Sequence, residues 1–182
     1  MLLSYVELVE LVARGVMENV AEGAINAASI DVRLGDSFRF EDTRINSTVN
    51  VVDLSKRESV QYISETIPDG EVAILRPAGF VLAHTMEKFN LPNNISAQFL
   101  LKSSVARNGL DHLSATWCDA GWHGSVLTLE LRNVTQMHNL LLRPGMFIGQ
   151  MKFYRHTPVP EEQSYGKRGR YNNDESVSEI KL

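Results

Sequence analysis

The sequence predicts a mainly β protein, an antiparallel sandwich or barrel that forms one domain over residues 1–182 and begins with a short helix. Short runs of alternating apolar and polar residues recur from Ile30 to Tyr154, and this period of two is typical of half-buried strands. Clusters of Gly, Pro, Asn and Asp separate the runs and mark turns. With 182 residues, 43% of them apolar, and no internal repeat or linker, the chain is suited to one core.

The first segment has the pattern of a short amphipathic helix. Ser4 and Glu7 stand at the spacing of a capping box, in which the two residues exchange hydrogen bonds at the start of a helix. The apolar stripe consists of Leu8, Leu11 and Val12. Gly15 follows this stripe and is expected to end the helix.

The strands that follow are short and are expected at residues 30–34, 71–75, 80–85, 96–101, 125–131, 139–142 and 147–154. Turn sequences such as Pro68-Asp69-Gly70 and Arg143-Pro144-Gly145 lie between them. Many short strands divided by turns favour an antiparallel architecture over a parallel α/β sheet. From Leu34 to about Val72 the chain is more polar, and we expect loops there with a short strand or helix.

The C-terminal segment has a different composition. Residues 163–174 read QSYGKRGRYNND, with no apolar periodicity but with glycines, cations and two tyrosines. Chain termini of this kind are commonly disordered. The same mixture of mobile glycines, cations and aromatic rings also suits a lid that orders over phosphates. We therefore expect residues 163–182 to be a flexible tail, with a lid as the alternative.

Composition excludes several classes of protein. A net charge of -4 argues against binding to a nucleic-acid backbone, which needs a basic surface, but leaves room for a small polyanion. No stretch approaches the roughly 20 apolar residues of a membrane span. The single cysteine, Cys118, excludes a disulfide framework within one chain, and the N-terminus lacks the pattern of a secretory signal. We expect a cytoplasmic protein with no nucleic-acid or membrane partner.

The segment from Lys102 to Arg107 (KSSVAR) places two cations and two hydroxyls directly after an apolar strand. Hydroxyls, backbone amides and fixed cations at the end of a strand are suited to binding phosphate oxygens. The alternative is an ordinary polar turn from a strand into a helix, with a serine as the N-cap.

Two further positions are candidates for chemistry. Asp119, beside a glycine and Trp122, can hold a sugar hydroxyl while the ring supports the sugar, although this pattern is also that of a tight turn with a core tryptophan. Glu130 shares one strand face with Val126 and Thr128. It is either a buried carboxylate tuned for proton transfer or a surface acid, depending on whether that face is covered.

Zinc-dependent deamination does not fit the sequence. Zinc nucleoside deaminases use a His or Cys ligand together with a paired-cysteine motif, and a glutamate lies beside the first ligand. One cysteine cannot supply such a pair, and none of the five histidines stands in an H-x-E motif.

Five segments, in this order and at this rough spacing, resemble the dCTP deaminase family of dUTPase-like proteins. They are 28–35 (ASIDVRLG), 102–107 (KSSVAR), 114–122 (SATWCDAGW), 128–133 (TLELRN) and 143–150 (RPGMFIGQ). The resemblance implies a distorted jelly-roll or β-barrel subunit in a homotrimer, with sites at subunit boundaries. This chain departs from the family pattern by one extra residue between Gly124 and Thr128.

The resemblance also implies residue roles. Glu130 corresponds to the general base that activates water for attack on C4 of cytosine, assisted by Ser103 and Arg107. Backbone groups near Ala115, with His112, read the base, and Trp122 packs on the deoxyribose. No metal takes part in the deamination, while Mg²⁺ accompanies the triphosphate. The phosphate contacts correspond to Lys102, Ser104, Tyr165 and Arg170.

The implied activity is conversion of dCTP to dUTP and ammonia without zinc, in pyrimidine deoxynucleotide metabolism. One alternative is a bifunctional enzyme that also cleaves the triphosphate to give dUMP and pyrophosphate, or a dUTPase alone, because Asp119 stands where dUTPases have a water-activating aspartate. An alternative from a different class is a non-catalytic nucleotide-binding regulator or structural jelly-roll protein.

Overall fold

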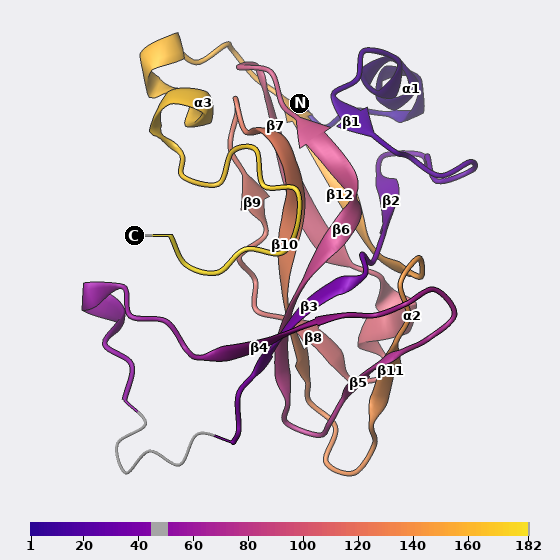
Figure 1. The fold of residues 1–182 in the computed structure, drawn as a ribbon. Coiled ribbons are helices and arrows are strands. Elements are labelled where there is room, and N and C mark those ends of the chain that lie inside the picture. Colours follow the sequence, from indigo (N-terminus) through magenta and orange to yellow (C-terminus); the bar gives the residue numbers. More distant parts are fainter. Residues whose placement is uncertain (45–50, 182) are drawn as a thin grey trace.

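The computed structural model describes residues 1–44 and 51–181, and in this part of the chain all strand pairs are antiparallel (Figure 1). The three sheets do not close into a barrel among these residues, so the architecture is a mainly β sandwich. One sheet has the order β4 (Tyr62–Thr66), β3 (Ser37–Glu41), β6 (Phe80–Asn90), β10 (His123–Asn133) and β8 (Leu110–His112), and β1 (Met17–Glu18) also pairs with β6. The second has the order β2 (Ile30–Arg33), β12 (Phe147–Arg155), β7 (Ile95–Leu101) and β9 (Trp117–Cys118). A small sheet joins β11 (Leu140–Leu142) to β5 (Ala73–Leu75).

The expected N-terminal helix is confirmed as α1 (Tyr5–Ala13). Ser4 and Glu7 form the capping box, and the Ser4 backbone N–H donates to Glu7 Oε2 at 3.1 Å. Leu8 and Leu11 are buried, as their stripe predicts. The helix ends at Ala13, just before Gly15. No helix in the described part of the chain has the length and apolar character needed to cross a membrane.

Each expected strand is present, but several extend further than the sequence pattern. β6 continues past Thr85 to Asn90, because β1 and β10 pair with its outer end. The polar segment 34–72 holds two paired strands, β3 and β4, and a short 3-10 helix η1 (Leu54–Lys56), although residues 45–50 lie outside the described residues. β4 has no buried side chain, so its sequence lacks the alternation that marks a strand.

The core is one cluster between the two larger sheets. Phe38, Phe89 and Leu129 enter it from the first sheet, and Phe99 and Phe153 enter it from the second. Gly149 in β12 is required by this packing, because an added Cβ would lie 2.1 Å from the Phe99 ring. This contact explains the glycine in the 143–150 segment.

The pairing of β6 and β10 is interrupted twice. On β10 one extra residue, Gly124, lies between the pairs His123–Asn90 and Ser125–Phe89. On β6 the extra residues lie opposite Leu127, whose backbone N–H donates to Thr85 Oγ1 at 3.0 Å. Bulges turn a strand locally and are frequent beside active sites. Both interruptions lie within six residues of Glu130 on β10.

Candidate active site

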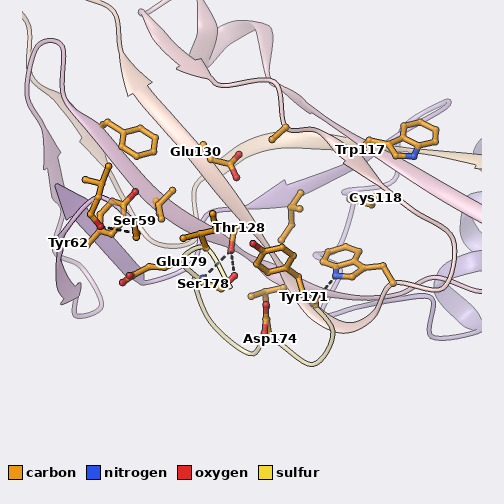
Figure 2. A pocket seen from close by; sticks show the side chains of 18 of the residues that line it. Ser59, Tyr62, Trp117, Cys118, Thr128, Glu130, Tyr171, Asp174, Ser178 and Glu179 are labelled. Atoms are coloured by element: carbon orange, nitrogen blue, oxygen red, sulfur yellow. Dashed lines mark hydrogen bonds between the residues drawn. The ribbon is translucent and has the colours of Figure 1, made fainter. Parts of the chain in front are cut away.

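A cavity of about 420 Å³ lies against the middle of β10 (Figure 2). Trp117 and Cys118 of β9 lie at one side of it, and Ser59 and Tyr62 lie at the other. Strand β6 and the C-terminal tail complete the wall. Five of the sequence-predicted site residues line this cavity: Ala115, Asp119, Trp122, Glu130 and Tyr165. The fold therefore brings together residues that are up to 50 positions apart in the chain.

Glu130 is the ionisable group best suited to proton transfer. It pairs with Leu82 on β6, and its side chain is 27% exposed, so the β10 face that carries it is largely covered. Burial raises the pKa of Glu130 from its ordinary value of 4.5 to about 7. At neutral pH the acid and carboxylate forms are similarly populated, which is the condition for a general acid–base group.

His112 lies directly behind this carboxylate. It is opposite Leu131 in the β8–β10 pair, and its Nε2 is 3.2 Å from Glu130 Oε2. The His112 ring is buried, and its centroid lies 4.9 Å from the centroid of the Phe99 ring. The desolvation that burial causes lowers the pKa of His112 from 6.5 to about 4. The imidazole is therefore neutral at pH 7, and the contact is not an ion pair. Neither His112 nitrogen has a well-aligned hydrogen-bond partner among the described residues.

The cavity lining is acidic. Among the described residues it contains no Lys, Arg or His, but it contains five carboxylates: Glu58, Asp119, Glu130, Asp174 and Glu179. Such a lining repels a phosphate chain. Any triphosphate that binds here needs cations from elsewhere.

Six predicted residues are not in the lining of the cavity: His112, which contacts Glu130, Arg170 in the tail, and four residues of the KSSVAR segment. Ser103, Ser104 and Arg107 are exposed on and just after α2 (Ser103–Ala106), and the described lining of the cavity contains none of them. Lys102 forms an ion pair with Asp31 and does not line the cavity either. The two hydroxyls and the Arg107 cation of this segment are thus exposed, whereas the Lys102 cation is engaged by Asp31.

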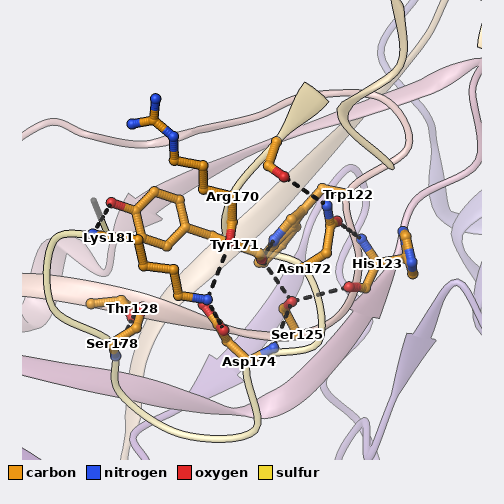
Figure 3. Close-up of polar contacts among 11 residues, drawn as sticks. Trp122, His123, Ser125, Thr128, Arg170, Tyr171, Asn172, Asp174, Ser178 and Lys181 are labelled. Atoms are coloured by element: carbon orange, nitrogen blue, oxygen red, sulfur yellow. Dashed lines mark hydrogen bonds and ion pairs between the residues drawn. The ribbon is translucent and has the colours of Figure 1, made fainter. Parts of the chain in front are cut away.

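The tail packs across the cavity in this structure (Figure 3). Trp122 Nε1–H donates to the Tyr171 carbonyl at 2.6 Å, and the Val126 backbone N–H donates to the Asp174 carbonyl at 2.8 Å. Lys181 forms an ion pair with Asp174, while the Arg170 side chain points away from these contacts. The tail borders the cavity through Tyr165, Tyr171, Asp174, Ser178, Glu179 and Ile180, and not through the Arg170 guanidinium.

Sequence reasoning missed several cavity residues. Thr128 could have been predicted, because it shares a strand face with Glu130. Tyr171 belongs to the tail segment whose composition suits a lid, but Tyr62 had no signal, since it comes from a polar segment without periodicity. Cys118 also lines the cavity, but burial raises the pKa of its thiol to about 12, so at neutral pH it is not a nucleophile. No group of three or more His, Cys, Asp and Glu side chains suited to a metal ion occurs in the described ranges.

Comparison with known proteins identifies the family of this chain. A family model described as dCTP deaminase-like matches residues 2–156. A dUMP-forming dCTP deaminase of Methanosphaerula palustris is 38% identical over 162 residues, covering 87% of this chain and 82% of that protein. One of Mycobacterium tuberculosis is 40% identical over 144 residues, covering 78% and 72%. The solved structure of 2'-deoxycytidine 5'-triphosphate deaminase from Agrobacterium tumefaciens has the same fold, with a TM-score of 0.63 at 19% identity over 89% of this chain and 50% of that one. The chain belongs to the dCTP deaminase-like family.

Proposed function

We propose that this protein hydrolyses the amino group of dCTP and releases ammonia, with Glu130 as the general base. The observation that carries the proposal is the carboxylate of Glu130, which lines a nucleoside-sized cavity and has a pKa of about 7. The names of the relatives support the same substrate.

The reaction needs one group that both accepts and donates protons. Glu130 takes a proton from water as the water oxygen bonds to C4 of cytosine, and the ring N3 is protonated in turn. Glu130 then takes the proton of the new C4 hydroxyl and passes it to the amino group, so that the C4–N bond breaks, ammonia leaves and C4=O forms. One water is consumed and no redox partner is needed. His112, being neutral, leaves the Glu130 proton available for these transfers.

We further propose a homotrimer in which each site is completed by a neighbouring subunit. The acidic cavity lacks phosphate-binding cations among its described lining, while Arg107, Ser103 and Ser104 are exposed elsewhere on the same chain. A neighbouring copy can bring these groups to the cavity, where Arg107 would stabilise charge and the serines would bind water and phosphate. Mg²⁺ enters with the triphosphate as part of the substrate, and its charge suits the carboxylate lining.

The second step depends on Asp119. The relatives are named dUMP-forming, and Asp119 lines the same cavity as Glu130, so we propose that the chain continues to dUMP and pyrophosphate. Release of dUTP after deamination is the second candidate.

Incubation with dCTP, dCMP and dUTP, with and without Mg²⁺, tests both steps through the ammonia and pyrophosphate formed. Ammonia and pyrophosphate in equal amounts from dCTP support the bifunctional reaction, and ammonia alone supports dUTP release. Pyrophosphate without ammonia identifies a dUTPase. Tight dCTP binding with neither product identifies a non-catalytic regulator.

Deamination should not depend on zinc. Treatment with a tight transition-metal chelator in excess Mg²⁺ should leave ammonia release unchanged, because the only cysteine is a buried thiol and Glu130 can activate water without zinc. Activity that disappears with the chelator and returns only on addition of Zn²⁺ contradicts the proposed water activation.

Removal of the tail after Gln163 should lower kcat/KM for dCTP by at least about tenfold, because Tyr165 and Tyr171 border the cavity and the removed cations can reach the phosphates. The penalty on any dCMP activity should be smaller. Folding should be retained, since the buried core cluster ends at Phe153. Thermal unfolding checks the fold, and dCTP turnover equal to that of the full chain would show that the tail is not a lid.

A further inference from the structure

A hydrogen bond at one wall of the cavity ties two residues of the 114–122 segment together. The indole Nε1–H of Trp117 donates to Asp119 Oδ1 at 2.9 Å. Both residues line the cavity. Trp117 is 55% exposed and its ring lies 5.8 Å from that of Tyr154, so the core does not account for its position.

Asp119 is held at this wall by its backbone as well. It directly follows β9, and its carbonyl accepts a hydrogen bond from the Trp122 backbone N–H at 3.2 Å. This turn places the Asp119 carboxylate and the Trp122 indole on the same wall. Asp119 forms no ion pair with any described cation. The bond from Trp117 engages Oδ1 and leaves Oδ2 able to accept a hydrogen bond from a ligand.

The acidic lining indicates which part of a nucleotide Asp119 can bind. A carboxylate repels phosphates, but it is a strong acceptor for a neutral hydroxyl group. Trp122, beside it, offers an aromatic face suited to the sugar. Of the groups in a deoxynucleotide, the sugar hydroxyl is therefore the one that fits this wall.

We propose that Trp117 is a positioning residue, whose indole N–H orients Asp119 so that its second oxygen accepts a hydrogen bond from the 3′-hydroxyl of the deoxyribose. This inference rests on the proposed nucleotide substrate. Trp117 acts through Asp119, and its loss should therefore affect ammonia release only when the substrate carries that hydroxyl.

The inference is tested by measuring ammonia release by the wild type and by one variant on two substrates, one with and one without the 3′-hydroxyl. Trp117→Phe keeps a ring against Tyr154 but removes the donor. It should lower kcat/KM for dCTP about fivefold to tenfold, chiefly through KM, as expected when one hydrogen bond to the substrate is weakened. With 2′,3′-dideoxycytidine triphosphate, which lacks the hydroxyl, the wild type and Trp117→Phe should react equally. The control Tyr154→Leu removes the packing and keeps the indole, and it should change both substrates by the same small factor.

Two results would overturn the inference: an equal loss on both substrates, which indicates a structural role, and no loss on either. If the wild type deaminates dCTP but Trp117→Phe changes kcat/KM by the same factor for both substrates, only the role of Trp117 is wrong. If the wild type does not deaminate dCTP, the proposed function is wrong. The role of Trp117 is then tested by calorimetric binding of dCTP and 2′,3′-dideoxycytidine triphosphate to the wild type and to Trp117→Phe. Weaker binding of dCTP alone by Trp117→Phe would then still support the positioning role.

Discussion

Replacing Glu130 with Gln should reduce deamination by at least about 10²–10⁴-fold while nucleotide binding is retained. Glutamine keeps the shape of the side chain and most of its hydrogen bonding, but it cannot accept a proton from water. Ammonia release at saturating dCTP, together with calorimetric binding, measures the two properties separately. The matched control is Glu179→Gln, which removes another carboxylate of the same cavity and should leave most of the rate. Near wild-type turnover by Glu130→Gln would refute the mechanism.

The raised pKa of Glu130 gives this variant a second signature. The base form is the carboxylate, so wild-type kcat/KM should rise with pH through about 7. A carboxyl whose pKa is raised on folding contributes stability at low pH, and this contribution is lost as pH rises through about 7. Glu130→Gln should therefore melt at a higher temperature than the wild type at pH 8 to about 9, and the difference should shrink at about pH 5.

Mixing two inactive variants should restore activity. If each site takes Glu130 from one subunit and Arg107 from its neighbour, Glu130→Gln and Arg107→Ala are each inactive alone. A trimer that contains both can still form a site from the intact Glu130 of one chain and the intact Arg107 of the next. Random assembly of equal amounts should give about a quarter of the wild-type sites.

Co-expression of the two variants with different affinity tags, followed by purification through both tags, isolates the mixed assemblies. The control is each variant co-expressed with itself under the same two tags. Recovered ammonia release in the mixed assemblies alone supports a site shared between subunits. If the mixed assemblies remain as inactive as the separate variants, Arg107 acts within its own chain or not at all.

Much of the fold follows from local patterns in the sequence. The Ser4–Glu7 capping box and the alternation in β10 each require only neighbouring residues, and both predictions are confirmed. The segment from Leu34 to Val72 was less predictable. Backbone hydrogen bonds to β3 hold β4 in place, although the side chains of β4 are not buried. Backbone pairing of this kind leaves no alternation of apolar and polar residues from which a strand could be predicted.

Some features of the candidate site are likewise predictable from the sequence, and others depend on the tertiary structure. The sequence by itself determined which residue types are present: a carboxylate within an apolar strand at Glu130, an acid at Asp119 and a cation beside hydroxyls at Arg107. Only the tertiary structure decided that Glu130 faces a covered cavity, because the burial that raises its pKa comes from β6, β8 and the tail, which are distant in sequence. It also decided that Arg107 and Glu130 do not line one cavity within this chain, because Arg107 follows α2, whose serines are exposed. Chemical identity is a property of each residue, whereas desolvation and distance are properties of the packing around it.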